Sequence, residues 1–189
     1  MKVLYLDTET TGVDHRTNEI TQIALIVEID GEVKEEVNFR CQPTNWDAID
    51  PKAIETTGVS IEQLKTFELP GETAKKIQAL FNRYIDKFDK SDKFYPAGHN
   101  VTFDLEFLQA FWKKHLDSYG TGSYQNWRAL DTRTLANFMA YKGIIQPSDL
   151  KLKTLCDLFH VTIQAHDAMS DIRATRELMN KMLLSLQVP

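Results

Sequence analysis

The first forty residues carry three β-strand patterns, and they constrain the fold of this chain more than any other segment. Lys2–Asp7 is mostly apolar, Ile20–Ile29 is rich in β-branched residues, and Glu32–Arg40 follows directly after Asp30-Gly31. An Asp-Gly pair between two strand patterns is a signal for a two-residue hairpin turn. We therefore expect the chain to begin with a sheet that contains at least one antiparallel pair.

Beyond residue 40, strand-like and helical patterns alternate. The segment Cys41–Pro70 is interrupted by proline and glycine and has room only for short helices. Two further strand patterns lie at Phe94–Gly98 and Arg128–Leu130. They alternate with helical patterns, which run over Glu72–Phe88, from Val101, from Asp131 or Thr132 to Tyr141, over Lys151–Phe159 and from about Ser170. This order predicts an α/β fold with helices packed on a mixed sheet. The 189 residues show no internal repeat or linker, so we expect residues 1–189 to form a single domain.

Several protein classes are excluded by what the sequence lacks. No apolar run reaches the about eighteen residues of a membrane span, so we expect no membrane partner. The first residues lack the apolar region and cleavage site of a signal peptide, so we expect a cytoplasmic protein. The two cysteines stand far apart in the sequence, so we expect free thiols. The glycine-rich patterns of NTPases and Rossmann dehydrogenases are missing, as is the Gly-x-Ser-x-Gly of serine hydrolases.

The formal net charge is −5, because 22 basic residues face 27 acidic ones. Affinity for nucleic acid normally comes from Lys and Arg side chains that neutralise phosphates, so this charge argues against a protein that coats nucleic acid. It leaves room for an enzyme that holds only the end of a strand. Where acidic residues surround bound cations, part of the negative formal charge belongs to a metal site.

The first chemical signal is the pair of carboxylates at the end of the first strand. Asp7 and Glu9 are two residues apart on a strand, so they share one face, with Cα atoms roughly 6.5 Å apart. Two carboxylates at the end of a buried strand are unfavourable unless a cation neutralises them, and Mg²⁺ and Mn²⁺ prefer such hard oxygen ligands. The alternative is an ordinary acidic turn.

The second signal is Asp104, which lies in the first turn of a predicted helix and is surrounded by apolar residues. This pattern places its carboxylate near the edge of the core. Two simpler interpretations remain open. An acidic residue in a first helical turn interacts favourably with the helix dipole, and Asn100 is a plausible N-cap.

The third signal is His166 followed five residues later by Asp171. Asp171 flanks the apolar stripe of the last helix, and His166 precedes that helix by about one turn. An imidazole beside a metal-bound carboxylate suits a general base that acts on water. The alternative is an ordinary surface or capping histidine.

Taken in order, three motifs resemble those of one family. They are Asp-x-Glu-Thr-Thr-Gly from Asp7, His-Asn-x-x-Phe-Asp-x-x-Phe-Leu from His99 and His-x-x-x-x-Asp from His166. The chain resembles the DEDDh, or DnaQ-like, 3′→5′ exonucleases, which include the proofreading subunit of bacterial replicative polymerase and RNase T. The resemblance extends from Lys2 to about Leu184. Any one motif is weak, but the ordered set is specific.

The resemblance implies an RNase H-like fold, a five-stranded mixed sheet in which three antiparallel strands are followed by two parallel ones, flanked by helices. It also implies that two divalent metal ions, Mg²⁺ or Mn²⁺, are bound by the four acidic residues Asp7, Glu9, Asp104 and Asp171. His166 would take the proton of the attacking water, and the product would be a nucleoside 5′-monophosphate. Asp131, more simply a helix cap, and Asp167, expected to point away, stay outside this catalytic set.

The same resemblance implies where the terminal nucleotide is bound. The positions that match the family pocket are Thr10, Thr11, Gly12, Val13, Asn100 and Phe103, with Val13 as an apolar wedge. Proofreading members commonly carry histidine where this chain has Thr57. This departure leaves open how the terminal base is unstacked and whether the protein proofreads, but it does not affect the metal ligands.

The expected partner is the 3′ end of a single strand rather than a duplex, because stacking on aromatic side chains tolerates any base. The strand can be DNA or RNA, and DNA is favoured. The sequence leaves open whether the protein acts alone or with a DNA polymerase as a partner. Six cations could guide phosphates or be ordinary surface charges: Lys113, Lys114, Arg128, Arg133, Lys151 and Lys153. Three alternative functions remain, namely an RNA-trimming exonuclease, a catalytically silent nucleic-acid-binding module, and a phosphohydrolase of nucleotides or short oligonucleotides.

Overall fold

In the computed structural model, which describes residues 1–163 and 167–186, five described strands form one mixed sheet. The strands are β1 (Lys2–Thr10), β2 (Ile20–Ile29), β3 (Glu32–Arg40), β4 (Tyr95–Gly98) and β5 (Leu130–Asp131), in the order β3-β2-β1-β4-β5. β1, β2 and β3 pair antiparallel, whereas β4 is parallel to β1 and β5 is parallel to β4. The expected mixed sheet, with three antiparallel strands followed by two parallel ones, is confirmed.

The described helices lie where helical patterns were expected, with some shifted ends. They are α1 (Pro51–Thr57), α2 (Ile61–Leu64), α3 (Pro70–Tyr84), α4 (Thr102–His115), α5 (Thr132–Tyr141), α6 (Leu152–Leu158) and α7 (Ala168–Ser185), with single 3₁₀ turns η1 (Trp46–Ala48) and η2 (Gly120–Ser123). The loop before α1 carries η1, and the segment between α4 and β5 carries η2.

The predicted end of the third helix, at Phe88, is wrong. α3 ends at Tyr84, and Phe88, expected on its buried face, is 85% exposed. The carboxylates of Asp86 and Asp92 accept hydrogen bonds from the backbone N–H groups of Phe88 and Asp86, at 3.0 and 2.9 Å. These local side-chain bonds offer the backbone an alternative to continuing the helix.

Two strand ends and one helix start also differ from expectation. β1 extends to Thr10 rather than ending at Asp7, because its pairing with β2 continues across a bulge after Glu9. β5 comprises Leu130–Asp131 instead of Arg128–Leu130. α7 begins at Ala168, two residues early, because Asp167 accepts a hydrogen bond from the Ser170 N–H and caps the helix.

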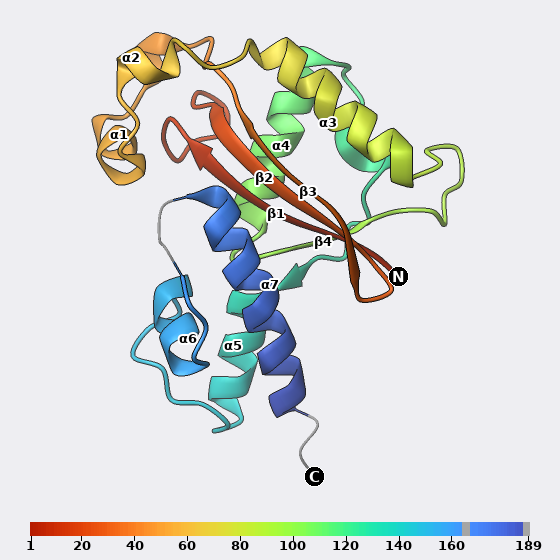
Figure 1. Cartoon of the computed structure of the whole chain (residues 1–189), viewed down its shortest axis with the longest axis vertical. Coiled ribbons are helices and arrows are strands. Elements are labelled where there is room, and N and C mark those ends of the chain that lie inside the picture. Colours follow the sequence, from red (N-terminus) through yellow and green to blue (C-terminus); the bar gives the residue numbers. More distant parts are fainter. Residues whose placement is uncertain (164–166, 187–189) are drawn as a thin grey trace.

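Alternate side chains of β1 enter two different cores. Leu4 and Leu6 belong to a cluster that includes Phe81 of α3, whereas Val3 and Tyr5 belong to a cluster formed with α7. In Figure 1 the central strands lie between α7 on one side and α4 on the other, and β1 runs toward α1. Residues 7 and 9 therefore face α7 and residue 8 faces α4, since strand side chains alternate.

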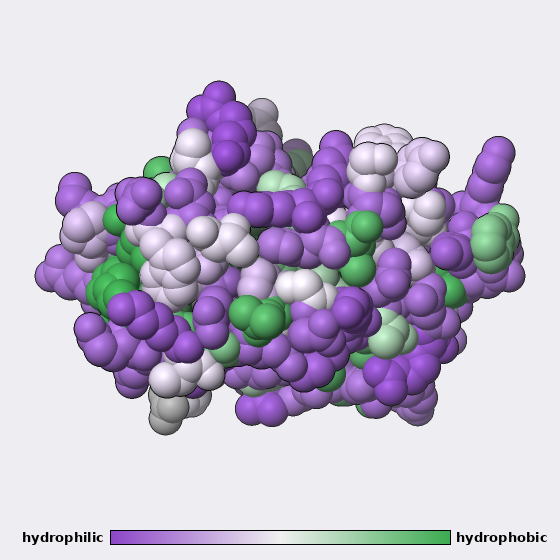
Figure 2. Space-filling view, turned by 90° about the horizontal axis from the view of Figure 1, so that it is seen from above, coloured by the Kyte–Doolittle hydropathy of each residue, from purple (hydrophilic) through white to green (hydrophobic). Residues whose placement is uncertain are grey.

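A third core fixes the C-terminal half of α7 against α5 and α6. Met139, Leu155 and Leu178, one from each helix, are all buried there. Cys41 and Cys156 are both buried free thiols, as expected. Among the described residues, none of the helices is long and apolar enough to cross a membrane. The face seen in Figure 2 is mostly hydrophilic with small separate apolar patches, which is usual for a surface in contact with water.

Candidate active site

Three carboxylates from two elements meet at the end of β1. Asp7 and Glu9 project from the β1 face that packs against α7, and Asp171 projects from the first turn of α7. One carboxylate oxygen of each lies within 4.8 Å of the others. The first turn of α7 also favours a negative side chain, because the N-terminal end of a helix carries partial positive charge.

Asp104 reaches the same end of β1 from the opposite side of the sheet. It lies in the first turn of α4 and is 4% exposed. Its Oδ1 accepts two hydrogen bonds from Thr8, one from the backbone N–H at 2.9 Å and one from Oγ1 at 2.7 Å. Thr8, which lies between Asp7 and Glu9 in β1, thus fixes the Asp104 carboxylate on the α4 side of the strand.

These carboxylates raise one another's pKa. Burial raises the pKa of Asp7 well above its ordinary value, and the charges of Asp104, Glu9 and Asp171 raise it further. Burial and then the carboxylate of Asp171 raise the pKa of Glu9 to about 7. Burial also raises the pKa of Asp104, although the hydrogen bonds from Thr8 oppose the rise. Without a cation, the ionised cluster is therefore strained electrostatically at neutral pH.

This donor set fits divalent cations. All its members are carboxylates, which are the hard oxygen ligands that Mg²⁺ and Mn²⁺ prefer. Three of them already place an oxygen within 4.8 Å of the other two, so they can share an ion without rearrangement of the backbone. A bound cation would relieve the repulsion that raises the pKa of Asp7 and Glu9.

The loop after β1 forms one border of the site. Thr11 is buried, its N–H donates to the Glu19 carbonyl at 2.8 Å, and its carbonyl accepts a hydrogen bond from the Asp50 N–H at 2.7 Å. Thr10 Oγ1 donates to the Gly12 carbonyl at 2.6 Å. These bonds hold the loop next to the start of α1.

The end of this loop presents an apolar side chain to solvent. Val13 is 81% exposed, which suits a side chain that inserts beside a base. Gly12 is required by a close approach, since a Cβ there would lie 2.5 Å from Asn18 Oδ1. Asn18 cannot easily move away, because its Oδ1 accepts from the Asp14 N–H and its Nδ2 donates to the Ala48 carbonyl at 2.6 Å.

Asn100 and Phe103 lie at the start of α4, beside Asp104. Asn100 has a left-handed backbone with φ +62° and is exposed, and its Oδ1 accepts a hydrogen bond from Arg133 Nη1 at 3.1 Å. The alternative of a side-chain cap at Asn100 is wrong, because its side chain does not cap α4. Phe103 is half-buried against Phe107, with ring centroids 4.8 Å apart.

Thr57, the last residue of α1, is less directly connected to the carboxylates. Its Oγ1 donates to the Ala53 carbonyl of its own helix at 3.0 Å. The link between α1 and the site runs instead through the cap residue Asp50, whose N–H binds the Thr11 carbonyl. His166, the expected general base, lies outside the described residues.

Three contributions were missed from the sequence. Thr8 holds Asp104, and the alternation of β1 could have indicated this because Thr8 faces the opposite side from Asp7. Asn18 supports the Gly12 loop from a position that no local pattern marks. Asp131 caps α5, as expected, and its carboxylate also accepts the N–H groups of Asn100 and Val101 at 3.1 and 3.0 Å, so it shapes the entry to α4.

Asp167 was expected to point away from the site. Its Oδ2 caps α7, and its Oδ1 accepts a hydrogen bond from Gln22 at 3.1 Å. The oxygens that cluster within 4.8 Å belong to Asp7, Glu9 and Asp171 among the described residues. The Asp167 charge is close enough to add a small rise to the pKa of Asp7 and Glu9.

Comparisons with known proteins agree on one family. A family model described as "Exonuclease" matches residues 4–179. Ribonuclease T from Actinobacillus pleuropneumoniae is 25% identical over 190 residues, which cover 96% of this chain and 83% of that protein. A PolC-type DNA polymerase III from Thermotoga petrophila is 25% identical over 173 residues, which cover 91% of this chain but 11% of the polymerase.

Solved structures of exonuclease I share the fold. E. coli exonuclease I in complex with a dT13 oligonucleotide is 24% identical, with a TM-score of 0.76, over 96% of this chain and 40% of that one. A zinc-bound form of an E. coli exonuclease I complex with single-stranded DNA is 25% identical, with a TM-score of 0.77, over 98% and 41%. The chain thus spans well under half of these larger proteins, and the RNase H-like fold that was expected is confirmed.

Proposed function

The chain belongs to the exonuclease family whose model spans residues 4–179, and from this premise we propose that it is a metal-dependent 3′→5′ exonuclease acting on single-stranded nucleic acid. Each turnover would release a nucleoside 5′-monophosphate, with residues 1–189 acting as one exonuclease domain. The observation that carries the proposal is the meeting of Asp7, Glu9 and Asp171 at the end of β1, within 4.8 Å, with Asp104 held beside them by Thr8.

Two divalent cations, Mg²⁺ or Mn²⁺, would be held by Asp7, Glu9, Asp104 and Asp171. When bound, such ions lower the pKa of a water molecule and stabilise the attacking and leaving oxygens of an in-line displacement. The all-carboxylate donor set supports this proposal, as does the raised pKa of Glu9. The zinc-bound exonuclease I complex supports divalent metal use in a protein of the same fold.

The chain's own residues would position the substrate and move one proton. The loop Thr10–Val13, with Asn100, Phe103 and Thr57, would hold the terminal nucleotide, with the exposed Val13 placed against its base. Thr8 keeps the Asp104 carboxylate fixed, so that this ligand would be in position before a cation binds. His166 would accept the proton of the attacking water, a role that rests on the family resemblance.

DNA is the proposed substrate, and RNA is the second candidate. The exonuclease I structures contain single-stranded DNA, and the PolC-type relatives are DNA polymerases, which supports DNA and a polymerase partner. RNA is supported by the Ribonuclease T relative, because the match covers 83% of that protein. A catalytically silent binding module is disfavoured, since all the acidic motif residues and His166 are present.

The test is degradation of a 5′-labelled single-stranded DNA and a matched RNA with Mg²⁺, Mn²⁺ or EDTA. We expect a ladder that shortens from the 3′ end and disappears with EDTA or with Asp7→Ala. The substrate that shortens faster decides between DNA and RNA. Intact strands in every metal, or an equal ladder from a cleanly purified Asp7→Ala protein, would refute the proposal.

A further inference from the structure

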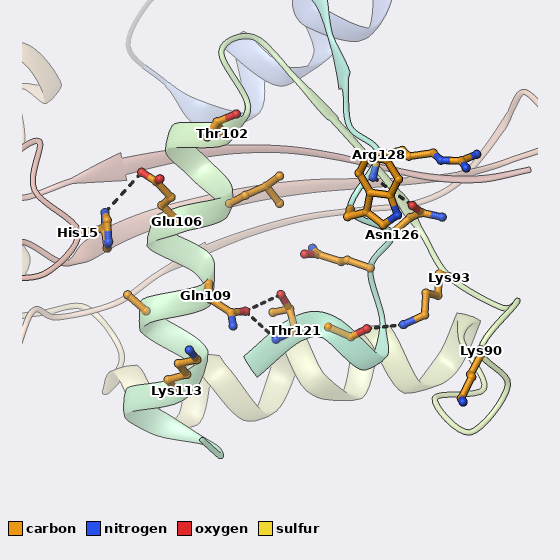
Figure 3. Close-up of a pocket in the computed structure, with 15 residues that line it drawn as sticks. His15, Lys90, Lys93, Thr102, Glu106, Gln109, Lys113, Thr121, Asn126 and Arg128 are labelled. Carbon is orange, nitrogen blue, oxygen red and sulfur yellow. Dashed lines mark hydrogen bonds and ion pairs between the residues drawn. The ribbon is translucent and has the colours of Figure 1, made fainter. Parts of the chain in front are cut away.

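A groove of about 910 Å³ runs along the outer side of α4, and none of the clustered carboxylates lines it. One wall is α4, from Thr102 to Lys113, and the other is the segment from Thr121 to Arg128. Figure 3 shows Thr102 and Lys113 at opposite ends of α4, with Lys90, Lys93 and Arg128 across from that helix. The eleven residue steps from Thr102 to Lys113 correspond to about 16.5 Å along the helix axis.

One end of the groove is formed by residues that neighbour the candidate active site in the sequence. Thr102, at one end, directly precedes Phe103 and lies two residues before Asp104 on the same helical turn. His15, at the same end, lies two residues after Val13, and its Nδ1 is 3.5 Å from Glu106 Oε2 on α4. A strand whose 3′ end lies at Asp104 would therefore reach the groove by passing around the first turn of α4, since residues two apart on a helix face different sides of it.

The charge of the groove is opposite to that of the protein. The chain carries −5 overall, yet four of the residues lining the groove are Lys90, Lys93, Lys113 and Arg128, against the single acid Glu106. The Glu106 carboxylate points toward His15, whose Nδ1 lies 3.5 Å from its Oε2, and not toward these cations (Figure 3). The groove thus concentrates positive charge where a phosphodiester backbone would pass.

Two of the six cations singled out in the sequence line this groove, and three of the others have acidic partners. Lys113 and Arg128 line it. Lys114 pairs with Glu19, Lys153 Nζ lies 2.9 Å from Asp157, and Lys151 lies 3.9 Å from Asp149. The structure therefore distinguishes cations that are already paired from cations that line a common surface.

An exposed aromatic ring completes the groove. Trp127 is 86% exposed, and the Arg128 guanidinium carbon lies 5.3 Å from its ring centroid. Large exposed aromatics are unfavourable in water, and indole and guanidinium faces are the surfaces on which nucleic acid bases stack. One base could lie against the open part of the Trp127 ring while neighbouring phosphates contact Arg128.

The wall that carries Trp127 is attached firmly to α4. Gln109 Oε1 accepts hydrogen bonds from the N–H and Oγ1 of Thr121, at 2.8 and 2.9 Å. A Cβ at Gly120, which has φ +76°, would lie 2.1 Å from the Gln109 amide, so the close approach requires glycine. Asn126 N–H donates to the Phe94 carbonyl at 2.7 Å. A groove already fixed in shape loses little entropy when it binds.

We propose that this groove binds the upstream part of the same single strand whose 3′ end lies at the carboxylates, with Trp127 stacking a base and Lys93, Lys113 and Arg128 contacting phosphates. The proposal rests on the proposed exonuclease function. It predicts that long strands bind more tightly than dinucleotides, because only long strands reach the groove.

The test compares Trp127→Ala with Tyr141→Ala. Tyr141 is a matched control, because it is 82% exposed, has Lys142 Nζ 5.9 Å from its ring centroid, and lies at the end of α5 outside the groove lining. For Trp127→Ala, kcat/KM on an oligonucleotide of about twelve nucleotides should fall about five-fold or more through KM. Hydrolysis of a dinucleotide should stay unchanged, and Trp127→Phe should keep most of the wild-type KM.

A second measurement separates phosphate contacts from folding. Binding of the labelled oligonucleotide is followed by fluorescence anisotropy in an Asp7→Asn background, which should leave the strand intact. Adding Lys113→Ala and Arg128→Ala should lower the slope of log Kd against log salt concentration by about 1.4, since each contact with a single strand contributes about 0.7. Lys142→Ala should leave the slope unchanged.

The two proposals fail in different ways. The groove proposal is wrong if the wild type degrades the long strand, Trp127→Ala and Tyr141→Ala have the same KM, and the salt slope does not change. An acidic peptide would then be the better ligand for the groove. If the wild type hydrolyses neither substrate, the exonuclease proposal is wrong. The anisotropy measurement then still decides whether the groove binds a strand.

Discussion

Replacing Glu9 with glutamine should stabilise the metal-free protein at neutral pH, although it removes a proposed metal ligand. Glutamine has nearly the same shape as glutamate and carries no charge. The pKa of Glu9 is raised from 4.5 to about 7, mainly by burial and then by Asp171. At about 1.4 kcal/mol for each pKa unit, the ionised Glu9 lowers the free energy of unfolding by about 3 kcal/mol above pH 7.

The sign of the pH dependence follows from which state binds the proton. Between about pH 4.5 and 7, folded Glu9 holds a proton that the unfolded chain has already released, so the free energy of unfolding falls as pH rises through this window. The raised pKa of Asp7 and Asp104 acts in the same direction. The gain from Glu9→Gln should therefore be about 3 kcal/mol at pH 8 and about 1 kcal/mol at pH 5.

Urea unfolding in EDTA, followed by circular dichroism at pH 5 and pH 8, measures this difference. Glu55→Gln is the control, because Glu55 is an exposed residue of α1. Adding Mg²⁺ should stabilise the wild type more than Glu9→Gln, since only the wild type keeps the full set of carboxylates. A Glu9→Gln protein no more stable than wild type at pH 8 in EDTA, or equally stabilised at both pH values, would refute the reasoning.

Two further predictions concern residues beside the cluster. Thr8→Val removes the Oγ1 hydrogen bond to Asp104 and should lower kcat with little change in KM. Thr8→Ser should keep this hydrogen bond and restore kcat. Equal kcat in the wild type, Thr8→Val and Thr8→Ser would rule out a positioning role for Thr8. His166→Ala should lower the rate about 10²–10⁴-fold if His166 is the general base. Asp167→Asn should have little effect on the rate, because asparagine also caps helices, and equal losses at positions 166 and 167 would mean that the base is wrongly assigned.

The local placement of each carboxylate follows from sequence patterns, whereas the meeting of all four at one site was expected only from the family resemblance. Strand alternation places Asp7 and Glu9 on one face, and helical periodicity places Asp104 and Asp171 in first turns. The hairpin at Asp30-Gly31 and the mixed sheet follow from turn chemistry and the order of the elements. These features depend on neighbours within a few residues, which a sequence displays directly.

The parts that could not be predicted depend on distant partners. Lys114 and Lys113 are adjacent in the sequence, yet Lys114 pairs with Glu19, 95 residues away, while Lys113 lines the groove. The end of α3 depends on the carboxylate of Asp92, which accepts the Asp86 N–H and lies four residues beyond the predicted end at Phe88. No periodicity marks such contacts, because they exist only once the chain has folded.

The central claim is that the acidic residues at the end of β1 form a divalent cation site that drives the exonuclease reaction. Calorimetric titration of Mn²⁺ into the wild-type protein and into Asp7→Asn, each checked for an intact fold, tests it most directly. We expect saturable binding of two ions by the wild type and the loss of at least one of them in Asp7→Asn. Equal binding by the two proteins, or no saturable binding by the wild type, would contradict the account.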